Sequence, residues 1–214
     1  MLDSVWNTGL ESDMYTVVIL IGYLLGALSP AALLSKAKNI NLRTSGSGNL
    51  GATNTMMVLG KGYGLLVMVL DIGKSYLAVK LSQLLFPKLA YAGLVAGFAA
   101  VVGHIYPFYM KFKGGKGLAT YGGLIIALHP RMVLLLLILC VSIMIVFNDG
   151  VAMAISVCTL YPILCMVSTG DWMELLLLIA LGLLVLLNHR SNLQESRQKT
   201  HIKVRTYIKE HFLR

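Results

Sequence analysis

Residues 131–147 read RMVLLLLILCVSIMIVF, and residues 172–188 read WMELLLLIALGLLVLLN. Each run approaches the roughly 20 apolar residues that a helix needs to cross a bilayer. The apolar residues are continuous rather than alternating, which favours helices over the strands of a membrane barrel. Similar runs recur, and we predict spanning segments near residues 15–35, 57–86, 89–110, 117–130, 131–147, 151–168 and 172–188. The sequence therefore predicts an all-α polytopic membrane protein with seven transmembrane helices.

The composition supports this class. Of the 214 residues, 57% are hydrophobic, and the mean hydropathy is +0.77, which is too apolar for an ordinary soluble domain. We expect a single integral membrane domain over residues 1–190, followed by a basic cytoplasmic tail over residues 191–214. The net charge of +9 gathers at the ends of the apolar runs. Lysine and arginine there set topology and meet anionic lipid headgroups, so membrane lipids are predicted partners and nucleic acid is not.

Charge asymmetry predicts the orientation. Basic residues fill the loops around residues 36–61 and 111–116 and the tail from Arg190, whereas carboxylates gather at residues 3–13 and 171–174. The positive-inside rule therefore places the N-terminus outside and the C-terminus in the cytoplasm.

The cysteines predict no disulfide framework. The chain has three cysteines, an odd number, and all lie inside apolar runs: Cys140, Cys158 and Cys165. A thiol there acts as a small hydrophobic group. No Cys/His spacing suggests a metal site, so we expect neither a metal nor another cofactor.

Residues 45–54, SGSGNLGATN, have the chemistry of a phosphate cradle. Glycine lets backbone N–H groups converge on an anion, and Asn54 can cap a following helix whose dipole favours negative charge. Arg43 can bind a phosphate with two hydrogen bonds, although it can also be a topology charge. A flexible polar connector is the alternative interpretation of the loop. The candidate phosphate-binding residues are Arg43, Ser45, Gly46, Gly48, Gly51, Thr53 and Asn54, and the candidate catalytic residues are Ser47 and Asn49.

Residues 112–117, FKGGKG, form a second glycine-rich loop. The spacing is not that of a nucleotide-binding loop. A lysine flanked by glycines is nevertheless a good point-charge phosphate binder, so Lys116 is a candidate catalytic residue. Lys111 and Lys113 raise the local positive potential, or serve only as topology charges. The candidate binding residues here are Lys113, Gly114, Gly115 and Gly117.

Three ionisable residues fall inside predicted spans. His104 near the end of the third span is either a proton carrier, as suits its pKa near neutrality, or a hydrogen-bonded structural group. Asp71 and Lys74 are spaced i,i+3, which predicts a neutralising structural pair. A supporting role beneath an active site is the alternative for this pair.

These residues resemble a known family, the bacterial membrane glycerol-3-phosphate acyltransferases that use acyl phosphate as donor. Residues 45–54 resemble its first motif, and Gly103, His104 and Pro107 with residues 112–120 resemble its second. Leu70, Asp71 and Lys74 also fit. The resemblance implies seven helices, an N-terminus outside, and transfer of a fatty acyl group to the 1-position of glycerol 3-phosphate without coenzyme A. The product would be lysophosphatidic acid, in phospholipid synthesis.

The third motif is similar only in part. His189, Arg190, Asn192 and Lys203 match it, and the resemblance implies that they contact substrate. The chain departs from it at Glu195, Lys199 and His201, and it has residues 148–156, NDGVAMAIS, where the family usually has a serine-rich stretch. A catalytically lost or altered paralogue that binds phospholipid or phosphate in the membrane is therefore the alternative function.

The leading prediction is acyl transfer between two phosphate-bearing substrates, acyl phosphate and glycerol 3-phosphate, at the cytoplasmic face of a bacterial inner membrane. The two loops would hold both phosphates, orient the glycerol hydroxyl and stabilise developing charge. The proton of the hydroxyl would pass either to His104 or to the phosphate of the donor.

Overall fold

The computed structural model describes residues 2–198 and 203–206, with side chains from Glu11 onward. The chain forms two compact units, Met1–Leu128 and His129–Arg214, and each is described by itself. Every regular element among the described residues is a helix, so the all-α class is confirmed. The single membrane domain over residues 1–190 stays a prediction, and most of the basic tail beyond Gln198 lies outside the described residues.

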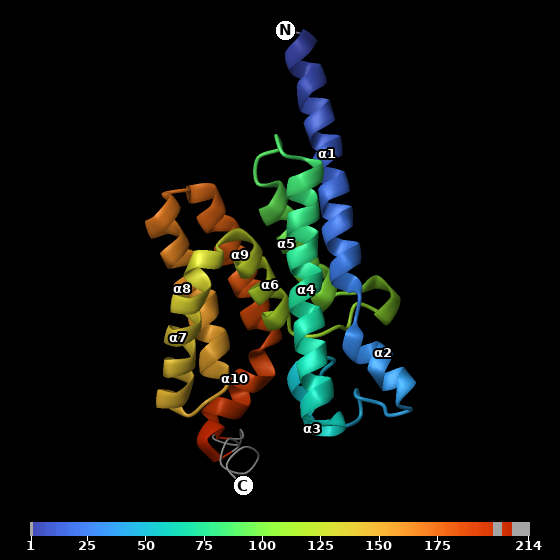
Figure 1. Cartoon of the computed structure of the whole chain (residues 1–214), viewed down its shortest axis with the longest axis vertical. Coiled ribbons are helices and arrows are strands. Elements are labelled where there is room, and N and C mark those ends of the chain that lie inside the picture. Colours follow the sequence, from blue (N-terminus) through green and yellow to red (C-terminus); the bar gives the residue numbers. More distant parts are fainter. Residues whose placement is uncertain (1, 199–202, 207–214) are drawn as a thin grey trace. The chain divides into compact units, whose positions relative to one another are not determined.

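The first unit is built around two long helices, α1 (Leu2–Ala27) and α4 (Lys61–Leu85), which pack against each other and against α5 (Ala92–Ile105) (Figure 1). Gly22 and Gly26 of α1 lie directly on α5, where an added Cβ would collide with the carbonyls of Ala96 and Ala100. Small residues let helices approach closely in membrane proteins. The other elements of this unit are α2 (Pro30–Ala37), α3 (Ala52–Leu59), the 3₁₀ turn η1 (Phe108–Met110) and α6 (Leu118–Leu128).

Two predicted spans contain a helix break, although residues 11–37 still form one candidate span. Residues 15–35 are interrupted between α1 and α2, where Ser29 caps α2 by accepting a hydrogen bond from the Ala32 N–H at 3.3 Å and Pro30 begins the new helix. Residues 57–86 are interrupted at Gly60, whose φ of +102° suits only glycine. Each break separates a long helix from a short one, and the two short helices, α2 and α3, precede and follow the first glycine-rich loop.

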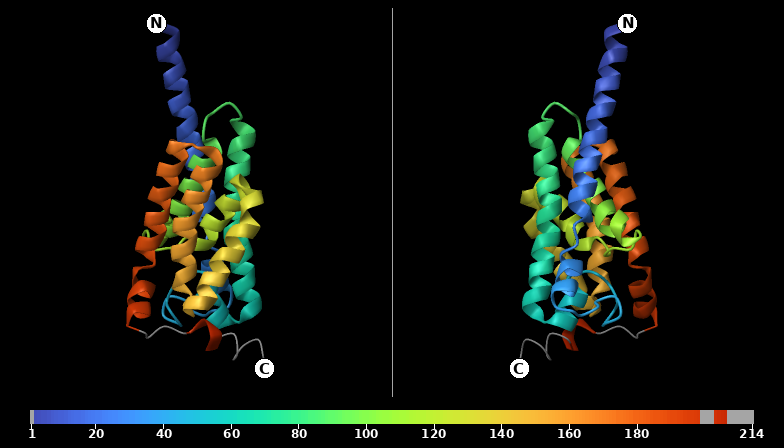
Figure 2. Two further views of the ribbon diagram at one scale, coloured as in Figure 1. Left: turned by 90° about the vertical axis from the view of Figure 1, so that its left-hand side faces the viewer. Right: turned by 90° about the vertical axis from the view of Figure 1, so that its right-hand side faces the viewer.

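The second unit contains α7 (Pro130–Phe147), α8 (Val151–Thr169), α9 (Trp172–Asn188) and α10 (Arg190–Arg197). Helix α8 packs against both α7 and α9 (Figure 2). Helices α7 and α8 end at Asn148 and Gly170, whose φ values of +54° and +67° are left-handed. Asp171 caps α9 by accepting hydrogen bonds from the N–H groups of Met173 and Glu174 at 2.9 and 3.0 Å.

Four helical segments in the described part of the chain are long and apolar enough to cross a bilayer: Glu11–Ala37, Ala92–Met110, Pro130–Phe147 and Val151–Thr169. The bent pair α9 and α10 is a further candidate. Large apolar side chains on α7 are exposed, among them Leu134, Val146 and Phe147, as expected of a lipid-facing helix. The coarser prediction of a polytopic helical protein agrees with these segments, while the number seven stays a prediction.

Candidate active site

The first unit brings the two glycine-rich loops together. The guanidinium Nη2 of Arg43, just before the first loop, donates a hydrogen bond to the carbonyl oxygen of Lys113 in the second loop. These residues are far apart in the sequence, and their contact joins the segment after α2 to the segment after η1. The sequence predicted that the two loops together hold both phosphates, and the contact between the two segments agrees with this prediction.

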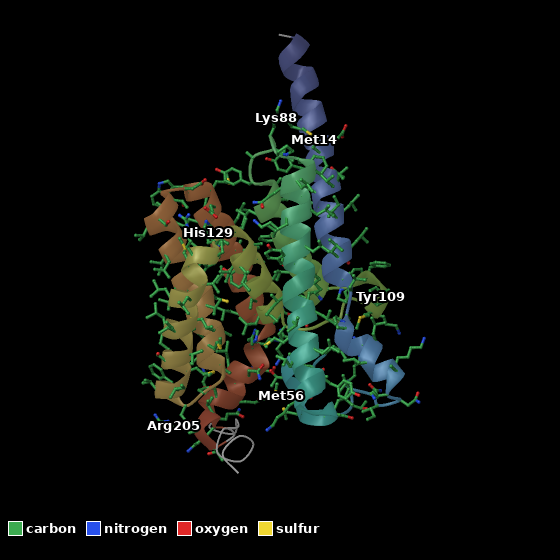
Figure 3. All side chains as sticks on the ribbon, viewed as in Figure 1. Met14, Met56, Lys88, Tyr109, His129 and Arg205 are labelled. Atoms are coloured by element: carbon green, nitrogen blue, oxygen red, sulfur yellow. The ribbon has the colours of Figure 1, made fainter. Side chains whose placement is uncertain are left out.

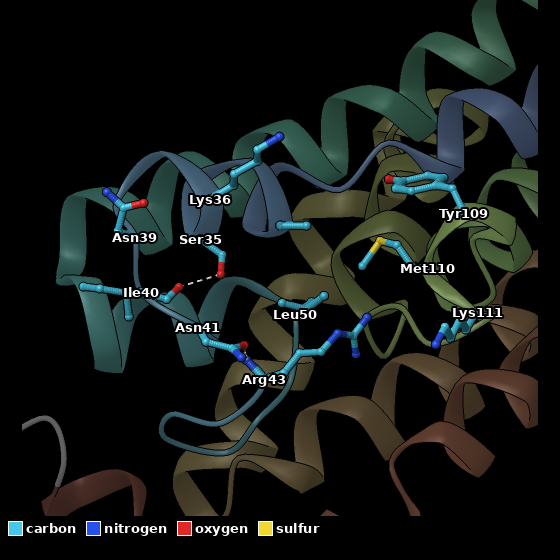
Figure 4. Close-up of a pocket in the computed structure, with 11 residues that line it drawn as sticks. Ser35, Lys36, Asn39, Ile40, Asn41, Arg43, Leu50, Tyr109, Met110 and Lys111 are labelled. Carbon is cyan, nitrogen blue, oxygen red and sulfur yellow. Dashed lines mark hydrogen bonds between the residues drawn. The ribbon is translucent and has the colours of Figure 1, made fainter.

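A pocket of about 570 Å³ lies beside this contact (Figure 4). Three basic residues line it, Lys36, Arg43 and Lys111, together with apolar surface from Leu50 and Met110. The remaining lining residues are Ala32, Ser35, Asn39, Ile40, Asn41 and Tyr109. Only Arg43 among them was predicted as a binding residue. In the sequence, the positive charge of Lys36 and Lys111 indicates membrane topology or a general positive potential, and it does not mark them as residues of a pocket.

The first loop is a tight turn built on glycine. Gly46 and Gly48 have φ values of +59° and +71°, and the Gly48 N–H donates to the Ser45 carbonyl at 3.1 Å. An added Cβ on Gly46 would collide with the Asn54 side-chain oxygen. Ser47 is exposed at the turn, and Asn49 is half-buried. The loop therefore presents polar groups over a backbone that only glycine permits.

Asn54 corrects the prediction of a helix cap. It lies inside α3, whose N-cap is Gly51, and its side chain is fully buried. Its Oδ1 accepts a hydrogen bond from the Ser47 N–H at 2.7 Å, and its Nδ2 donates to the Leu42 carbonyl at 2.9 Å. A buried side-chain amide needs hydrogen-bond partners for both its oxygen and its nitrogen. Asn54 finds both partners in the backbone, and so it holds the loop closed.

The start of α3 keeps the anion-favouring geometry that the sequence predicted. No side chain in the described part of the chain caps Gly51. The Gly51 carbonyl accepts the first helical hydrogen bond from the Thr55 N–H at 3.0 Å, and Thr53 is exposed in the first turn. The N–H groups of a helix start favour negative charge, and here they stand next to the loop that contains Ser47.

The second loop folds back onto the end of α5. The N–H groups of Gly114 and Gly115 donate to the carbonyls of Ile105 and His104 at 2.8 and 3.1 Å. An added Cβ on Gly115 would collide with the Nε2 atom of His104. Gly117, with φ of +90°, then turns the chain into α6. Lys116 is half-buried between this turn and Gly115, so its backbone position is tightly fixed.

His104 belongs to a buried cluster of charges beneath the second loop. Lys74 Nζ lies 2.8 Å from Asp71 Oδ1, which confirms the predicted pair, and 2.8 Å from His104 Nδ1. His104 Nδ1 lies 3.3 Å from Asp71 Oδ1, and Lys74 Nζ donates to the Leu28 carbonyl at 2.6 Å. All three ionisable side chains are buried. The histidine thus supports the loop backbone, and the pocket lining does not include it.

The third-motif residues lie in the second unit. His189, at the junction of α9 and α10, is buried, and its Nδ1 lies 2.9 Å from the Val185 carbonyl. Arg190 and Lys203 are exposed, and Asn192 is half-buried. Lys199 and His201, two positions where the chain departs from the third motif, lie outside the described residues.

The 148–150 turn contacts the chain that follows α9. The Ser196 hydroxyl donates to Asp149, and the Arg205 N–H donates to the Asn148 side-chain oxygen at 2.7 Å. Residues 148–156, which replace the expected serine-rich stretch, therefore begin in direct contact with the region of the divergent third motif.

Residues 16–199 match the protein family described as Glycerol-3-phosphate acyltransferase. The chain belongs to this family. A glycerol-3-phosphate acyltransferase of Exiguobacterium sibiricum is 39% identical over 198 residues, covering 90% of this chain and 95% of the relative. Another, from Bacillus velezensis, is 34% identical over 198 residues, covering 91% of this chain and all of the relative.

Solved structures of the family share the fold. The crystal structure of PlsY (YgiH), an integral membrane glycerol 3-phosphate acyltransferase, in its glycerol 3-phosphate form has a TM-score of 0.82 and 29% identity. The match covers 88% of this chain and 94% of that chain. Its lysophosphatidic acid form has a TM-score of 0.79. Together with the apolar helices, this likeness shows that the chain is a multi-pass integral membrane protein.

Proposed function

We propose that this protein transfers a fatty acyl group from acyl phosphate to the 1-hydroxyl of glycerol 3-phosphate, giving lysophosphatidic acid for phospholipid synthesis. One observation carries the proposal: the Arg43 guanidinium bridges the two glycine-rich loops at the carbonyl of Lys113, beside a pocket with three basic residues. The relatives support it, because they are glycerol-3-phosphate acyltransferases and one structure is of the glycerol 3-phosphate form.

The pocket suits substrates that carry phosphate groups. Lys36, Arg43 and Lys111 line one pocket and supply positive charge there, and Leu50 and Met110 supply apolar surface. Holding both substrates in one place replaces a bimolecular encounter with a reaction between oriented neighbours. Membrane lipids would surround the exposed apolar helices and accommodate the acyl chain of the donor.

The reaction needs no covalent enzyme intermediate. The 1-hydroxyl oxygen of glycerol 3-phosphate attacks the acyl carbonyl carbon, the bond from that carbon to the donor phosphate oxygen breaks, and inorganic phosphate leaves. Lys116 and the polar side chains of Ser47 and Asn49 stabilise the negative charge that develops on the carbonyl oxygen and on the leaving phosphate.

The attacking hydroxyl gives its proton to the leaving phosphate. His104 is the other candidate acceptor, but its Nδ1 lies against Lys74 and Asp71, and its Nε2 lies beneath Gly115. A general base must reach the proton that it removes. We therefore assign His104 to positioning the second loop.

The proposed topology has seven passes, with the N-terminus outside and the C-terminus in the cytoplasm of a bacterial cell. The charge asymmetry of the loops supports it, because the basic loops of both glycine-rich motifs then share the cytoplasmic face with the tail. Acyl phosphate and glycerol 3-phosphate, which are both anionic, would reach the site from that side.

The purified protein, incubated with acyl phosphate and labelled glycerol 3-phosphate, should yield labelled lysophosphatidate. Acyl-coenzyme A should yield none, since the loops lack the spacing of a nucleotide cradle. A folded protein that binds glycerol 3-phosphate and makes no product would favour the second candidate, a non-catalytic membrane protein that binds phosphate or phospholipid. The departures at Glu195 and at residues 148–156 favour that candidate.

A further inference from the structure

Three metal-ligating side chains meet at one end of the second unit. His129 stands at the start of α7, Cys165 in the last turn of α8 and Glu174 in the first turn of α9. One potential ligand atom from each residue lies within 4.8 Å of the others. Because α8 is antiparallel to both of its neighbours, the start of α7, the end of α8 and the start of α9 share one end of the unit. Figure 3 labels His129 at this end.

We propose that His129, Cys165 and Glu174 bind a divalent ion of the zinc class. The donor set is one imidazole nitrogen, one sulfur and one carboxylate oxygen, with room for a water as the fourth ligand. Zn²⁺ takes these donors in a tetrahedral arrangement. The sulfur discriminates against Mg²⁺ and Ca²⁺, which prefer oxygen ligands alone. The site would tie together the ends of three helices.

The distances fit such an ion after a small adjustment. His129 Nε2 lies 3.8 Å from Glu174 Oε1. Zinc bonds of about 2.0–2.3 Å with tetrahedral angles place two ligand atoms about 3.3–3.8 Å apart. All three potential ligand atoms lie within 4.8 Å of one another. The Cys165 thiol already lies within hydrogen-bond reach of the Glu174 carboxylate, so both groups face the same point.

Tyr161 orients the histidine for this role. Tyr161 is fully buried in α8, and its hydroxyl oxygen lies 2.9 Å from His129 Nδ1. When Nδ1–H donates to this oxygen, the lone pair remains on Nε2, the nitrogen that faces Glu174. Metal-binding histidines commonly fix their second ring nitrogen in this way.

Burial favours an ion that stays bound. The Cys165 side chain is fully buried, and the side chains of His129 and Glu174 are 20% and 12% exposed. On binding, the thiol of Cys165 loses its proton to solvent, and the thiolate and the carboxylate together neutralise the two positive charges of the ion. Cys140 and Cys158 are also buried, but the cluster does not include them, which makes them natural controls.

The proposed site is separate from the proposed acyl-transfer chemistry. Glu174 and the third-motif residue His189 stand at opposite ends of α9, about 22 Å apart at 1.5 Å per residue. The ion would therefore act on the stability of the second unit and would not contact substrate.

Cobalt titration tests the site directly. The full-length protein, purified in detergent and stripped of metal, should bind one Co²⁺ per chain and show the charge-transfer absorption of a cobalt–thiolate bond, which zinc abolishes by displacement. The absorption should persist in Cys158→Ala and vanish in Cys165→Ala. Tyr161→Phe should weaken zinc binding by about 10–100-fold, as expected for the loss of a group that orients a ligand.

Thermal unfolding gives a second readout. Zinc should raise the unfolding midpoint of the native chain and of Cys158→Ala, and should leave those of Cys165→Ala and Glu174→Gln unchanged. If Cys165→Ala does not fold, Glu174→Gln and the native chain still decide the question. A folded native chain without the cobalt–thiolate absorption would overturn the proposal, as would an absorption that survives Cys165→Ala and disappears in Cys158→Ala.

Discussion

Asn54→Ala tests whether Asn54, the most buried polar residue of the first loop, holds the loop closed or contacts substrate. The substitution removes the acceptor for the Ser47 N–H and the donor to the Leu42 carbonyl. Each backbone group left without a partner costs about 1–3 kcal/mol when water cannot reach it. Ser47 is exposed and can bind water instead, whereas Leu42 is fully buried. We expect a loss of about 2–4 kcal/mol in the free energy of unfolding, most of it from the Leu42 carbonyl.

Thermal unfolding of the purified protein without substrate measures this loss. The expected fall in the unfolding midpoint is about 4–16 °C for a chain of this size. Met57→Ala is the matched control, because Met57 is exposed on the same helix and its loss should change stability by less than about 0.5 kcal/mol. An unchanged midpoint in Asn54→Ala, accompanied by lost glycerol 3-phosphate binding, would refute the structural role and return Asn54 to the substrate-contacting residues.

Three further predictions concern the second loop. Lys116→Ala should lower turnover about a hundredfold or more without altering the fold, while Lys113→Ala should cost less; near-normal turnover in folded Lys116→Ala would make this lysine a topology charge. Gly115→Ala should lose activity and stability, because its Cβ would meet the His104 ring, whereas Gly122→Ala, which meets open space on α6, should be tolerated. In a background without native cysteines, an impermeant reagent applied to intact cells should fail to label a cysteine at position 116, and labelling there would invert the proposed topology.

The sequence was sufficient to predict the helices and the loops that carry chemistry. Long apolar runs predict α7, α8 and α9 to within a few residues, and α8 continues through the proline at position 162. The two interrupted spans show the limit of this reasoning. Ser29 with Pro30, and Gly60, are ordinary local signals for a helix boundary, but the apolar residues on both sides masked them.

The contacts between distant segments could not be predicted. Nothing in the local pattern indicates that Arg43 reaches the Lys113 carbonyl, or that Lys36 lines the same pocket. Asn54 fitted a helix cap by its residue type and its position in the sequence, and only the buried backbone groups around it show its actual role. Likewise, His129, Cys165 and Glu174 are spread over three helices, so no spacing along the chain reveals the cluster.

The buried charges beneath the second loop hold the polar loops of the candidate site in place on apolar helices. Ionisable groups away from water are costly unless they pair, and Asp71 and Lys74 pair with each other and with His104. Lys74 also binds the Leu28 carbonyl at the α1–α2 break, and the His104 ring lies under Gly115. The cluster on α4 and α5 therefore fixes both the segment that leads into the pocket and the loop that presents Lys116. This connection gives a structural reason for charged residues in the interior of the first unit: they hold in fixed geometry the two segments on which the proposed chemistry depends.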